Sequence, residues 1–339
     1  MYIPSKIKSI KPLGRQTVYD LTVENSHSFL ANGLVAHNCV EPNLQNIPRD
    51  TTASDIKRMF IVPDGYILLE VDYSQAELRI IAEMSEDPSM IEIFRKNHNI
   101  HVATACKMFK GQYEEVKAIL KDSNHPDWLK WEKQKKIGKS LNFSIIYQQG
   151  DKATAETLGV SEKKAAKFKD EWYAQFPKVK KWLKKQKNYA REHEYVYNFF
   201  GRKRRLYDIN SSRFGLRSEA ERQAINAPVQ GSSGDFTLFS QVVIREEIMR
   251  GNLPSDLSHL YTVHDSIGYA IRPEDVHKTV PKLIKICDNP ETMEFFGFKM
   301  KHVTMKVSAE LGLHWADLKE YDPWTNYKNL LIPSDTIKN

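Results

Sequence analysis

Two aspartates stand where apolar runs of the sequence end. The run Tyr66–Val71 ends in Asp72, and a segment with helical spacing of apolar residues follows at once. Asp265 lies between the apolar runs Leu260–Val263 and Ile267–Ile271, so we expect it near the tip of a hairpin. Ends of strands and loops are the places where catalytic side chains most often lie. A lone acid there is more often solvated than functional, so the surrounding residues must decide.

The triplet His37-Asn38-Cys39 has the residue types for cutting and remaking a peptide bond. The Asn38 side-chain amide can attack its own backbone carbonyl, which forms a succinimide and cuts the bond to Cys39. The Cys39 thiolate can accept an acyl group from an upstream chain, after which the ester rearranges to an amide. His37 and His27 are suited to move protons near neutral pH. The triplet alone is uninformative, so its flanking sequence matters.

The flanking sequence makes this chemistry specific. Val18–Val23 reads as a strand, and Asn32-Gly33 is a two-residue hairpin signal between Ser28–Ala31 and Leu34–His37. Together with the triplet, V-Y-D-L-T-V-E-N-S-H-S-F and A-N-G-L-V-A-H-N-C resemble the C-terminal half of an intein. The resemblance implies a small all-β fragment at residues 1–38 that acts in trans with an N-terminal intein half on a second polypeptide. Residues 39–339 would then end the joined product.

Four side chains recur every four residues farther along the chain: Lys135, Lys139, Phe143 and Tyr147. On a helix they form one slowly winding stripe of two cations followed by two rings, and apolar residues between them form a second stripe that can face a core. The spacing leaves two interpretations open. One is a solvated lysine helix with two core aromatic residues, and the other is a helix whose lysines hold a triphosphate.

A second set with the same spacing is Arg222, Asn226 and Gln230, which share one face if the segment is helical. Pro228 would then lie at a kink or a boundary. An arginine with two amides suits the acceptors of the DNA minor groove, which every correct base pair presents alike. The basic segment Gly201–Ser211 is suited to phosphate contact.

Composition sets broad limits. The 339 residues could hold two or three structural units, and 50 Lys and Arg against 43 Asp and Glu give a net charge of +7 and a pI near 9.0. This excess agrees with a polyanionic partner but does not separate a nucleic-acid-binding protein from an ordinary basic enzyme. Three widely spaced cysteines make neither a disulfide framework nor a zinc site. The lysine-rich run 161–194 reads as solvated faces of amphipathic helices.

No signal peptide or apolar run of membrane length occurs in the sequence. The cysteine usage fits a reducing compartment. We therefore expect a soluble protein without a membrane partner, in the cytoplasm of a bacterial cell or a phage-infected host.

The motifs around these residues resemble, in order, those of the family A DNA polymerases, the DNA polymerase I type. They read C-V-E-P-N-L-Q-N-I-P, D-Y-S-Q-A-E-L-R, N-I-H-V-A-T-A, K-x-x-x-K-x-x-x-F-x-x-x-Y, G-R-K-R-R-L-Y-D-I-N-S, R-Q-A-I-N-A-P-V-Q-G and V-S-A-E-L-G-L-H-W, and the resemblance runs from residue 39 to about residue 324. It implies an α+β fold, with a polymerase palm of antiparallel sheet and helices and mostly helical fingers. We expect the palm at 39–84 and 216–339 and the fingers at 85–215.

The resemblance also implies roles for single residues. It implies deoxynucleotidyl transfer to a primer 3′-hydroxyl by two Mg²⁺ ions, with Mn²⁺ as a substitute, held by the catalytic carboxylates of Asp72 and Asp265 and by the Tyr73 carbonyl. The dNTP would contact Gln75, Glu77, His101, Lys135, Lys139, Phe143 and Tyr147, and Glu77 would crowd a 2′-hydroxyl. The primer–template DNA would contact Arg202, Arg204, Arg222, Asn226, Gln230 and His264. The remaining partner would be an N-terminal polymerase half that carries the N-terminal intein fragment.

Three residues depart from the family's pattern. Lys135 replaces an arginine and lacks its planar fork, Gln148 replaces the glycine after Tyr147, and Ser266 replaces the glutamate of a His-Asp-Glu string. We expect an active enzyme with an altered rate or metal dependence. The alternatives are a nucleic-acid-binding fragment with impaired catalysis, a cargo that is inert until joined, and a single-subunit RNA polymerase, against which Glu77 argues.

Overall fold

The computed structural model describes residues 28–31, 34–37, 57–288 and 297–331. The chain divides into two compact units, Met1–Ala53 and Ser54–Asn339, and each is described by itself. In the first unit, β1 (Ser28–Ala31) pairs antiparallel with β2 (Leu34–His37). The two strands have the bounds that the Asn32-Gly33 signal predicts. The predicted strand Val18–Val23 lies outside the described residues.

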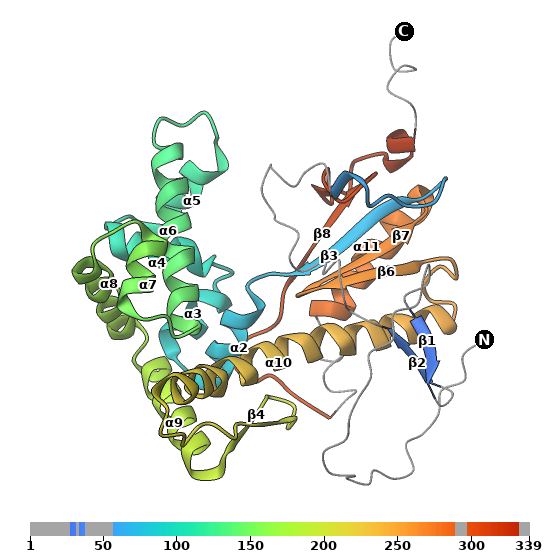
Figure 1. Ribbon diagram of the computed structural model, residues 1–339. Coiled ribbons are helices and arrows are strands. Elements are labelled where there is room, and N and C mark those ends of the chain that lie inside the picture. The colour runs from blue at the N-terminus through green and yellow to red at the C-terminus, as the bar shows by residue number, and fades with distance from the viewer. Residues whose placement is uncertain (1–27, 32–33, 38–56, 289–296, 332–339) are drawn as a thin grey trace. The chain divides into compact units, whose positions relative to one another are not determined.

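The second unit holds the other elements (Figure 1). Its strands are β3 (Ile67–Tyr73), β4 (Tyr195–Tyr197), β5 (Lys203–Arg205), β6 (Ser258–Val263), β7 (Ser266–Ile271), β8 (Val307–Gly312) and β9 (Lys319–Glu320). Its helices are α2 (Ala76–Ser85), α3 (Pro88–Arg95), α4 (Ile100–Phe109), α5 (Tyr113–Lys121), α6 (Trp128–Ile146), α7 (Asp151–Leu158), α8 (Glu162–Gln175), α9 (Pro177–His193), α10 (Phe214–Met249) and α11 (Val276–Asp288), with 3₁₀ turns η3 (Pro273–Asp275) and η4 (Tyr327–Leu331). None of the described helices is both long and apolar enough to cross a membrane.

Five strands form an antiparallel sheet in the order β6-β7-β3-β8-β9. The central strand β3 reads I-L-L-E-V-D-Y, and its first three residues are buried on both faces, as expected for the middle of a sheet. Beyond Leu69 the strand alternates, because Val71 and Tyr73 are buried and Glu70 and Asp72 are only partly covered. One face of the sheet is therefore packed at this end and the other is polar.

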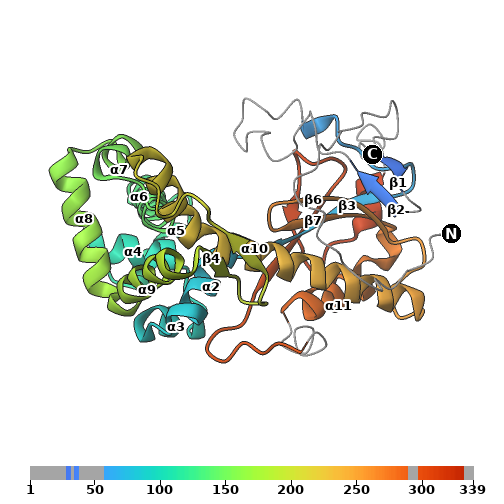
Figure 2. The same ribbon diagram turned by 60° about the horizontal axis from the view of Figure 1, so that its bottom comes forward.

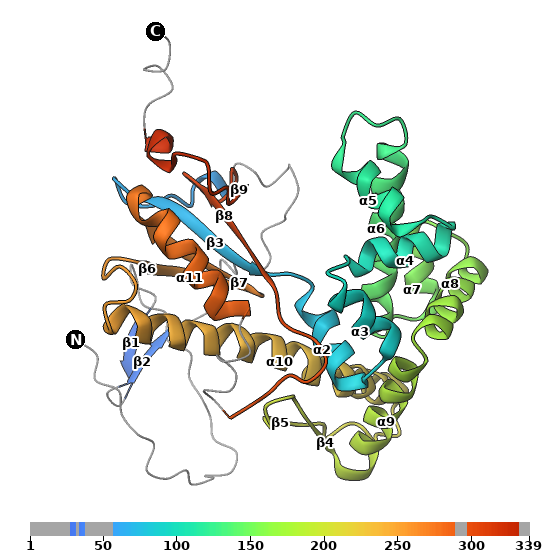
Figure 3. The same cartoon turned by 180° about the vertical axis from the view of Figure 1, so that it is seen from behind.

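Helix α11 covers one face of this sheet and packs against α10 (Figures 1 and 3). We call these strands together with α10 and α11 the sheet body. Its packed face belongs to a large apolar core that includes Ile67, Val71, Phe236 and Leu283. Burial of such side chains stabilises a fold by about 1.5–3 kcal/mol each, so this core holds β3 in the sheet body.

The remaining helices, α2 to α9, form a second group beside the sheet body, which we call the helical group (Figure 2). Its inner element is α6, which packs closely on α4. Asp87 joins two helices of the group, because its carboxylate accepts the N–H groups of Ser89 and Met90 at the start of α3 and of Lys178 at the start of α9. The fold is thus α+β, as predicted, with an antiparallel sheet and many helices.

Candidate active site and nucleic-acid interface

Asp72 and Asp265 lie on neighbouring strands at the same end of the sheet. Strand β3 places Asp72 opposite Ser266, the first residue of β7. The backbone N–H of Tyr73 donates to the carbonyl oxygen of Asp265 at 3.2 Å. Asp265 is the second residue of the tight turn between β6 and β7, and the first, His264, has a φ of 56°. One strand pair therefore brings the backbones of the two aspartates together, as the hairpin prediction requires.

Alternation along β3 places the Asp72 side chain on the face opposite the ring of Tyr73. The ring of Tyr73 is buried on the packed face, where its hydroxyl lies 2.5 Å from the Ser240 hydroxyl of α10. Burial is the main reason that the pKa of Tyr73 is raised. Asp72 precedes Tyr73 and so lies on the opposite face, which it shares with Glu70, a carboxylate that accepts the hydroxyl of Tyr261 at 2.8 Å.

The oxygen donors at this sheet end suit a hard divalent cation. Two carboxylates and the backbone carbonyl of Tyr73 are donors that Mg²⁺ prefers, and Mg²⁺ commonly uses one or two carboxylates with water and phosphate. Ser266 supplies no carboxylate to this set. Its hydroxyl is buried and donates to the Val263 carbonyl at 3.0 Å. Within the described residues, no cluster of three or more His, Cys, Asp and Glu could hold a metal alone. The donor set fits an ion that completes its shell with substrate oxygens.

Glu77 and Tyr147 form a hydrogen-bonded pair close to Asp265. Tyr147 ends α6, and its hydroxyl donates to Oε2 of Glu77 in the first turn of α2 at 2.9 Å. Burial raises the pKa of Glu77 and the nearby charge of Asp265 raises it further, while hydrogen bonds from Tyr147 and Gln230 lower it. The pKa of Tyr147 is raised by burial and then by Glu77. Three helices, α2, α6 and α10, thus contribute to one small polar cluster beside the aspartate turn.

The predicted stripe on α6 lies on one side of the helix. The rings of Phe143 and Tyr147 stack with centroids 5.8 Å apart, and Nζ of Lys139 lies 6.0 Å from the Phe143 centroid. Lys135 forms an ion pair with Glu132 at 3.2 Å, and its side chain is about one-third exposed. The cationic and aromatic parts of the stripe are continuous, and the aromatic end meets the cluster around Glu77.

His101 joins this stripe from α4 and is kept neutral. Its ring lies 5.7 Å from the Phe143 ring, and its Nδ1 lies 3.0 Å from the amide nitrogen of Asn142. The Asn142 oxygen already accepts the Thr104 hydroxyl and the Trp172 indole N–H, so its nitrogen must donate to Nδ1 of His101. The His101 proton then resides on Nε2. Burial and the charges of Lys139 and Lys135 lower the pKa of His101 to about 4.

Gln75 links the end of β3 to the start of α4. It has a φ of 57°, and its side-chain oxygen accepts the backbone N–H of Ile100 at 2.8 Å. Asn99 accepts the next two N–H groups of the same helix. Satisfying these N-terminal groups fixes α4, and with it His101, relative to the strand that carries Asp72.

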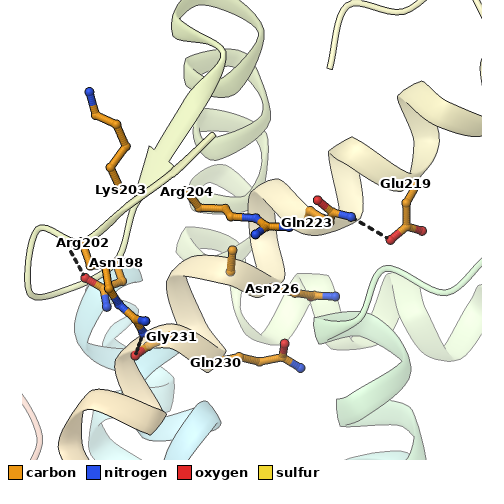
Figure 4. Close-up of a pocket in the computed structure, with 10 residues that line it drawn as sticks. Asn198, Arg202, Lys203, Arg204, Glu219, Gln223, Asn226, Gln230 and Gly231 are labelled. Carbon is orange, nitrogen blue, oxygen red and sulfur yellow. Dashed lines mark hydrogen bonds between the residues drawn. The ribbon is translucent and has the colours of Figure 1, made fainter. Parts of the chain in front are cut away.

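A polar cavity of about 530 Å³ lies between α10 and the β4–β5 hairpin (Figure 4). Its lining residues come from both elements: Asn198, Arg202, Lys203, Arg204, Glu219, Gln223, Asn226, Ala227, Gln230 and Gly231. Four of the residues that the sequence assigns to DNA contact, Arg202, Arg204, Asn226 and Gln230, therefore line one cavity. Arg222 is not among its lining residues and pairs with Glu219 one turn away.

The cavity's shape depends on contacts between the hairpin and α10. Arg202 donates to the Gly231 carbonyl at 3.1 Å and pairs with Asp235 at 3.0 Å. A Cβ at Gly231 would lie 3.3 Å from Nη2 of Arg202, so a glycine permits this close approach. Helix α10 continues through Pro228 and Gly231, so the proline is not the helix boundary that the sequence left open.

Sequence reasoning missed several polar residues that build these sites. Asn142 is fully buried between Thr104 and Trp172, and Asn198 holds the β4–β5 loop by accepting the N–H of Arg202 at 2.8 Å. The sequence signal that could have identified Asn142 is its place as a polar residue within an apolar stretch of α6. No local pattern marks Asn198.

The residues assigned to peptide-bond chemistry are mostly beyond the described part of the chain. His27, Asn38 and Cys39 lie outside it, as does the segment 39–48, and His37 is the last residue of β2. Their roles stay predictions from the sequence.

Comparisons with known proteins bear on the second unit. Residues 33–317 match the family described as DNA polymerase family A. The chain is 31% identical over 282 residues to DNA polymerase I of Caldicellulosiruptor bescii, 32% over 282 residues to that of Geobacillus stearothermophilus and 31% over 283 residues to the thermostable DNA polymerase I of Thermus aquaticus. These matches cover 82%, 83% and 83% of this chain, and 30%, 30% and 31% of the relatives. The chain thus spans less than one-third of their length.

The fold is also similar to a solved structure, the POL domain of Pol1 from M. smegmatis in complex with DNA primer-template and dNTP. The TM-score is 0.68 at 28% sequence identity, over 81% of this chain and 45% of that one. Since the family match extends over most of the sequence and over the sheet body and helical group alike, the chain belongs to DNA polymerase family A.

Proposed function

We propose that this chain is the C-terminal part of a template-directed DNA polymerase, which transfers deoxynucleotides from dNTPs to a primer 3′-hydroxyl. The observation that carries the proposal is the arrangement at one sheet end. Asp72 and Asp265 meet there across one strand pair, and the pair Glu77–Tyr147 lies close enough for Asp265 to raise the pKa of both. Family membership and the relatives named above support this reaction class.

Two Mg²⁺ ions, which Mn²⁺ can replace, would be held by Asp72, Asp265 and the Tyr73 carbonyl. When bound, such ions activate the primer 3′-oxygen and offset charge on the leaving pyrophosphate. The chain's own cations bind the rest of the triphosphate. Lys139 and Lys135 supply two positive charges along α6.

Neutral His101 complements these lysines. Because Nδ1 accepts a hydrogen bond from Asn142, Nε2 carries the proton and can donate to a phosphate oxygen without adding charge. Gln75 supports this contact indirectly by holding the start of α4. Phe143 and Tyr147 offer ring faces to the nascent base pair, and Glu77, held by Tyr147, crowds a 2′-hydroxyl.

The cavity between α10 and the β4–β5 hairpin is proposed to hold primer–template DNA. Asn226 and Gln230 can donate to minor-groove acceptors, which are alike in all correct pairs, while Arg202 and Arg204 contact phosphates. Arg222 would have to leave Glu219 to take part. His264, exposed at the aspartate turn, would lie at the primer end. In this assignment residues 39–84 and 216–339 are the palm and residues 85–215 are the fingers.

We further propose that residues 1–38 act as the C-terminal half of an intein that joins this chain to an N-terminal polymerase half. The support is the string around His37-Asn38-Cys39 with His27 upstream and the β1–β2 pair that precedes it.

A second candidate function is DNA binding with impaired catalysis. It is favoured by Ser266, whose hydroxyl donates to a backbone carbonyl within the β6–β7 hairpin. The proposed metal ligands then include only two carboxylates, those of Asp72 and Asp265. Purified chain and its upstream half, mixed with primer–template, dNTPs and Mg²⁺, separate the candidates when chain mass and primer extension are followed together. We expect ligation and extension from the native sequence, ligation without extension from Asp72→Asn, and neither from Asn38→Ala. Ligation of the native chain without any extension would refute the polymerase and leave the second candidate.

A further inference from the structure

Helix α9 carries most of the chain's excess positive charge. Its 17 residues hold six lysines and Arg191 against one acid, Glu192, a net charge of +6. The whole chain of 339 residues has a net charge of +7. The net charge of the remaining sequence is therefore close to zero, although α6 is also basic, with five lysines against one acid.

The apolar residues of α9 fix which side of the helix faces solvent. Val179, Trp182, Leu183 and Ala190 are buried, and α9 packs against α2, α8, α10 and β4. The opposite side carries five exposed lysines: Lys178, Lys180, Lys181, Lys184 and Lys185. The helix lies beside the β4–β5 hairpin (Figures 2 and 3), although its lysine side takes no part in the DNA cavity. We call these five residues the lysine face.

Like charges are neighbours throughout the lysine face. Lys180 and Lys184 are one turn apart, as are Lys181 and Lys185, and Lys178 and Lys181 are three residues apart. Such pairs destabilise a helix. No residue of the described ranges forms an ion pair with any lysine of the face, although Lys180 lies over the Tyr173 ring.

Some lysines of the other described helices are paired with acids, whereas others, such as Lys133, Lys136 and Lys163, are exposed without an ion pair. Lys96, Lys130 and Lys167 are exposed and Lys117 is partly exposed, and each pairs with an acid three or four residues away. That is the usual arrangement of a solvated surface. The lysine face gathers five lysines without an ion pair on one side of a single helix, and such a density of positive charge suits a polyanionic partner.

We propose that the lysine face binds the phosphate backbone of DNA at a place separate from the cavity between α10 and the β4–β5 hairpin. None of the large apolar side chains that are exposed in the described residues lies on α9. Interfaces with protein partners are enriched in such side chains. DNA interfaces are polar and strongly positive. Lys178 and Lys185 are about 10 Å apart along the axis, a distance over which duplex DNA presents about six phosphates.

The contact is independent of sequence, since lysine side chains that meet only phosphates read no base. It would lengthen the time that the enzyme spends on its template without touching the reacting groups. The inference does not depend on catalysis, so it can hold even if the proposed polymerase activity fails, and the reverse is equally true.

The test compares two variants of the full chain that have lost the same charge. One is Lys178→Gln/Lys181→Gln/Lys184→Gln/Lys185→Gln, and the control is Lys96→Gln/Lys117→Gln/Lys130→Gln/Lys167→Gln. Both are made in the Asp72→Asn background, and binding to a fluorescent primer–template is followed by anisotropy between about 50 and 200 mM salt.

The expected result is a change in the salt dependence of binding. Each phosphate contact contributes about 0.7–0.9 to the slope of log K against log salt, so the α9 variant should lose about 3 and the control less than about 1. The α9 variant should melt at the same temperature or higher, because like-charge repulsion is relieved, whereas the control loses ion pairs. Equal slopes in the two variants would overturn the proposal, as would a native chain that binds no DNA at the lowest salt. A face intended for an acidic protein would give equal slopes.

Discussion

A pH-dependent loss of stability should originate at His101. His101 is 7% exposed, and the amide of Asn142 donates to its Nδ1. Protonation would place two N–H groups face to face and add a charge beside Lys139 and Lys135. Burial, followed by these two charges, lowers the pKa of His101 to about 4.

The magnitude follows from linkage. Unfolded His101 has its ordinary pKa of about 6.5, while the folded value is about 4. Below about pH 6.5 the unfolded chain therefore binds a proton at His101 that the folded chain does not bind. The free energy of unfolding falls as the pH drops towards 4. The loss is about 2 kcal/mol at pH 5 and about 3 kcal/mol once the folded ring also titrates. Above pH 6.5 the group has no effect.

The assay is denaturant unfolding of the native chain and His101→Gln at about pH 8 and pH 5. Glutamine can still accept from Asn142 and does not titrate, so acid effects of carboxylates cancel in the comparison. We expect the native chain to lose about 2 kcal/mol more than the variant. Asn142→Asp should have the opposite effect and raise the pKa of His101, as read by ring NMR. Identical losses, or a native ring that titrates near 6.5, would refute the argument.

Three further changes test other contacts. Tyr147→Phe removes the hydrogen bond to Glu77 and should lower discrimination against ribonucleotides about tenfold, or about 1–2 kcal/mol, in competitive incorporation. Asp87→Ala removes the acceptor for two helix starts and should lower the free energy of unfolding by about 2–4 kcal/mol, against about 1 for Ser161→Ala. Gly138→Ala puts a Cβ 2.6 Å from a backbone oxygen of α4 and should cost about 1–3 kcal/mol in thermal unfolding.

Each of these has a result that contradicts it. Unchanged sugar selection in Tyr147→Phe would mean that Glu77 keeps its place without the phenol. Equal effects of Asp87→Ala and Ser161→Ala would mean that Asp87 caps only one helix. An unchanged melting temperature for Gly138→Ala, with Gly150→Ala as a control because nothing lies within 4 Å of its Cβ position, would mean that α4 and α6 can separate.

Local patterns predicted the elements that carry the chemistry. The apolar run before Asp72, the turn at Asp265 and the stripe from Lys135 to Tyr147 all appear in the structure, as a strand end, a hairpin and one helix side. Each depends on period and turn chemistry within about 15 residues, which a sequence expresses directly. The strand pair at Asn32-Gly33 is of the same kind.

The supports of the site could not be predicted, because they join distant parts of the chain. Glu83 is buried and accepts three successive backbone N–H groups, those of residues 301–303, and Arg79 donates to the carbonyls of Ser74 and Thr304. The two side chains of α2 thus hold the segment that leads into β8. In the sequence they read as ordinary charged residues of an amphipathic helix.

The order of strands has a consequence for how this protein folds. The central strand β3 is made early in the chain, yet both of its neighbours, β7 and β8, come from its last third. During synthesis α2 to α10 can form local contacts while β3 still has two open edges. Pairing of strands so far apart in the sequence is slow, because the entropy of closing a long loop is lost before any stabilising contact forms. The two aspartates therefore meet only late, and a ribosome that stops before β8 would release a chain with an apolar strand edge exposed to aggregation.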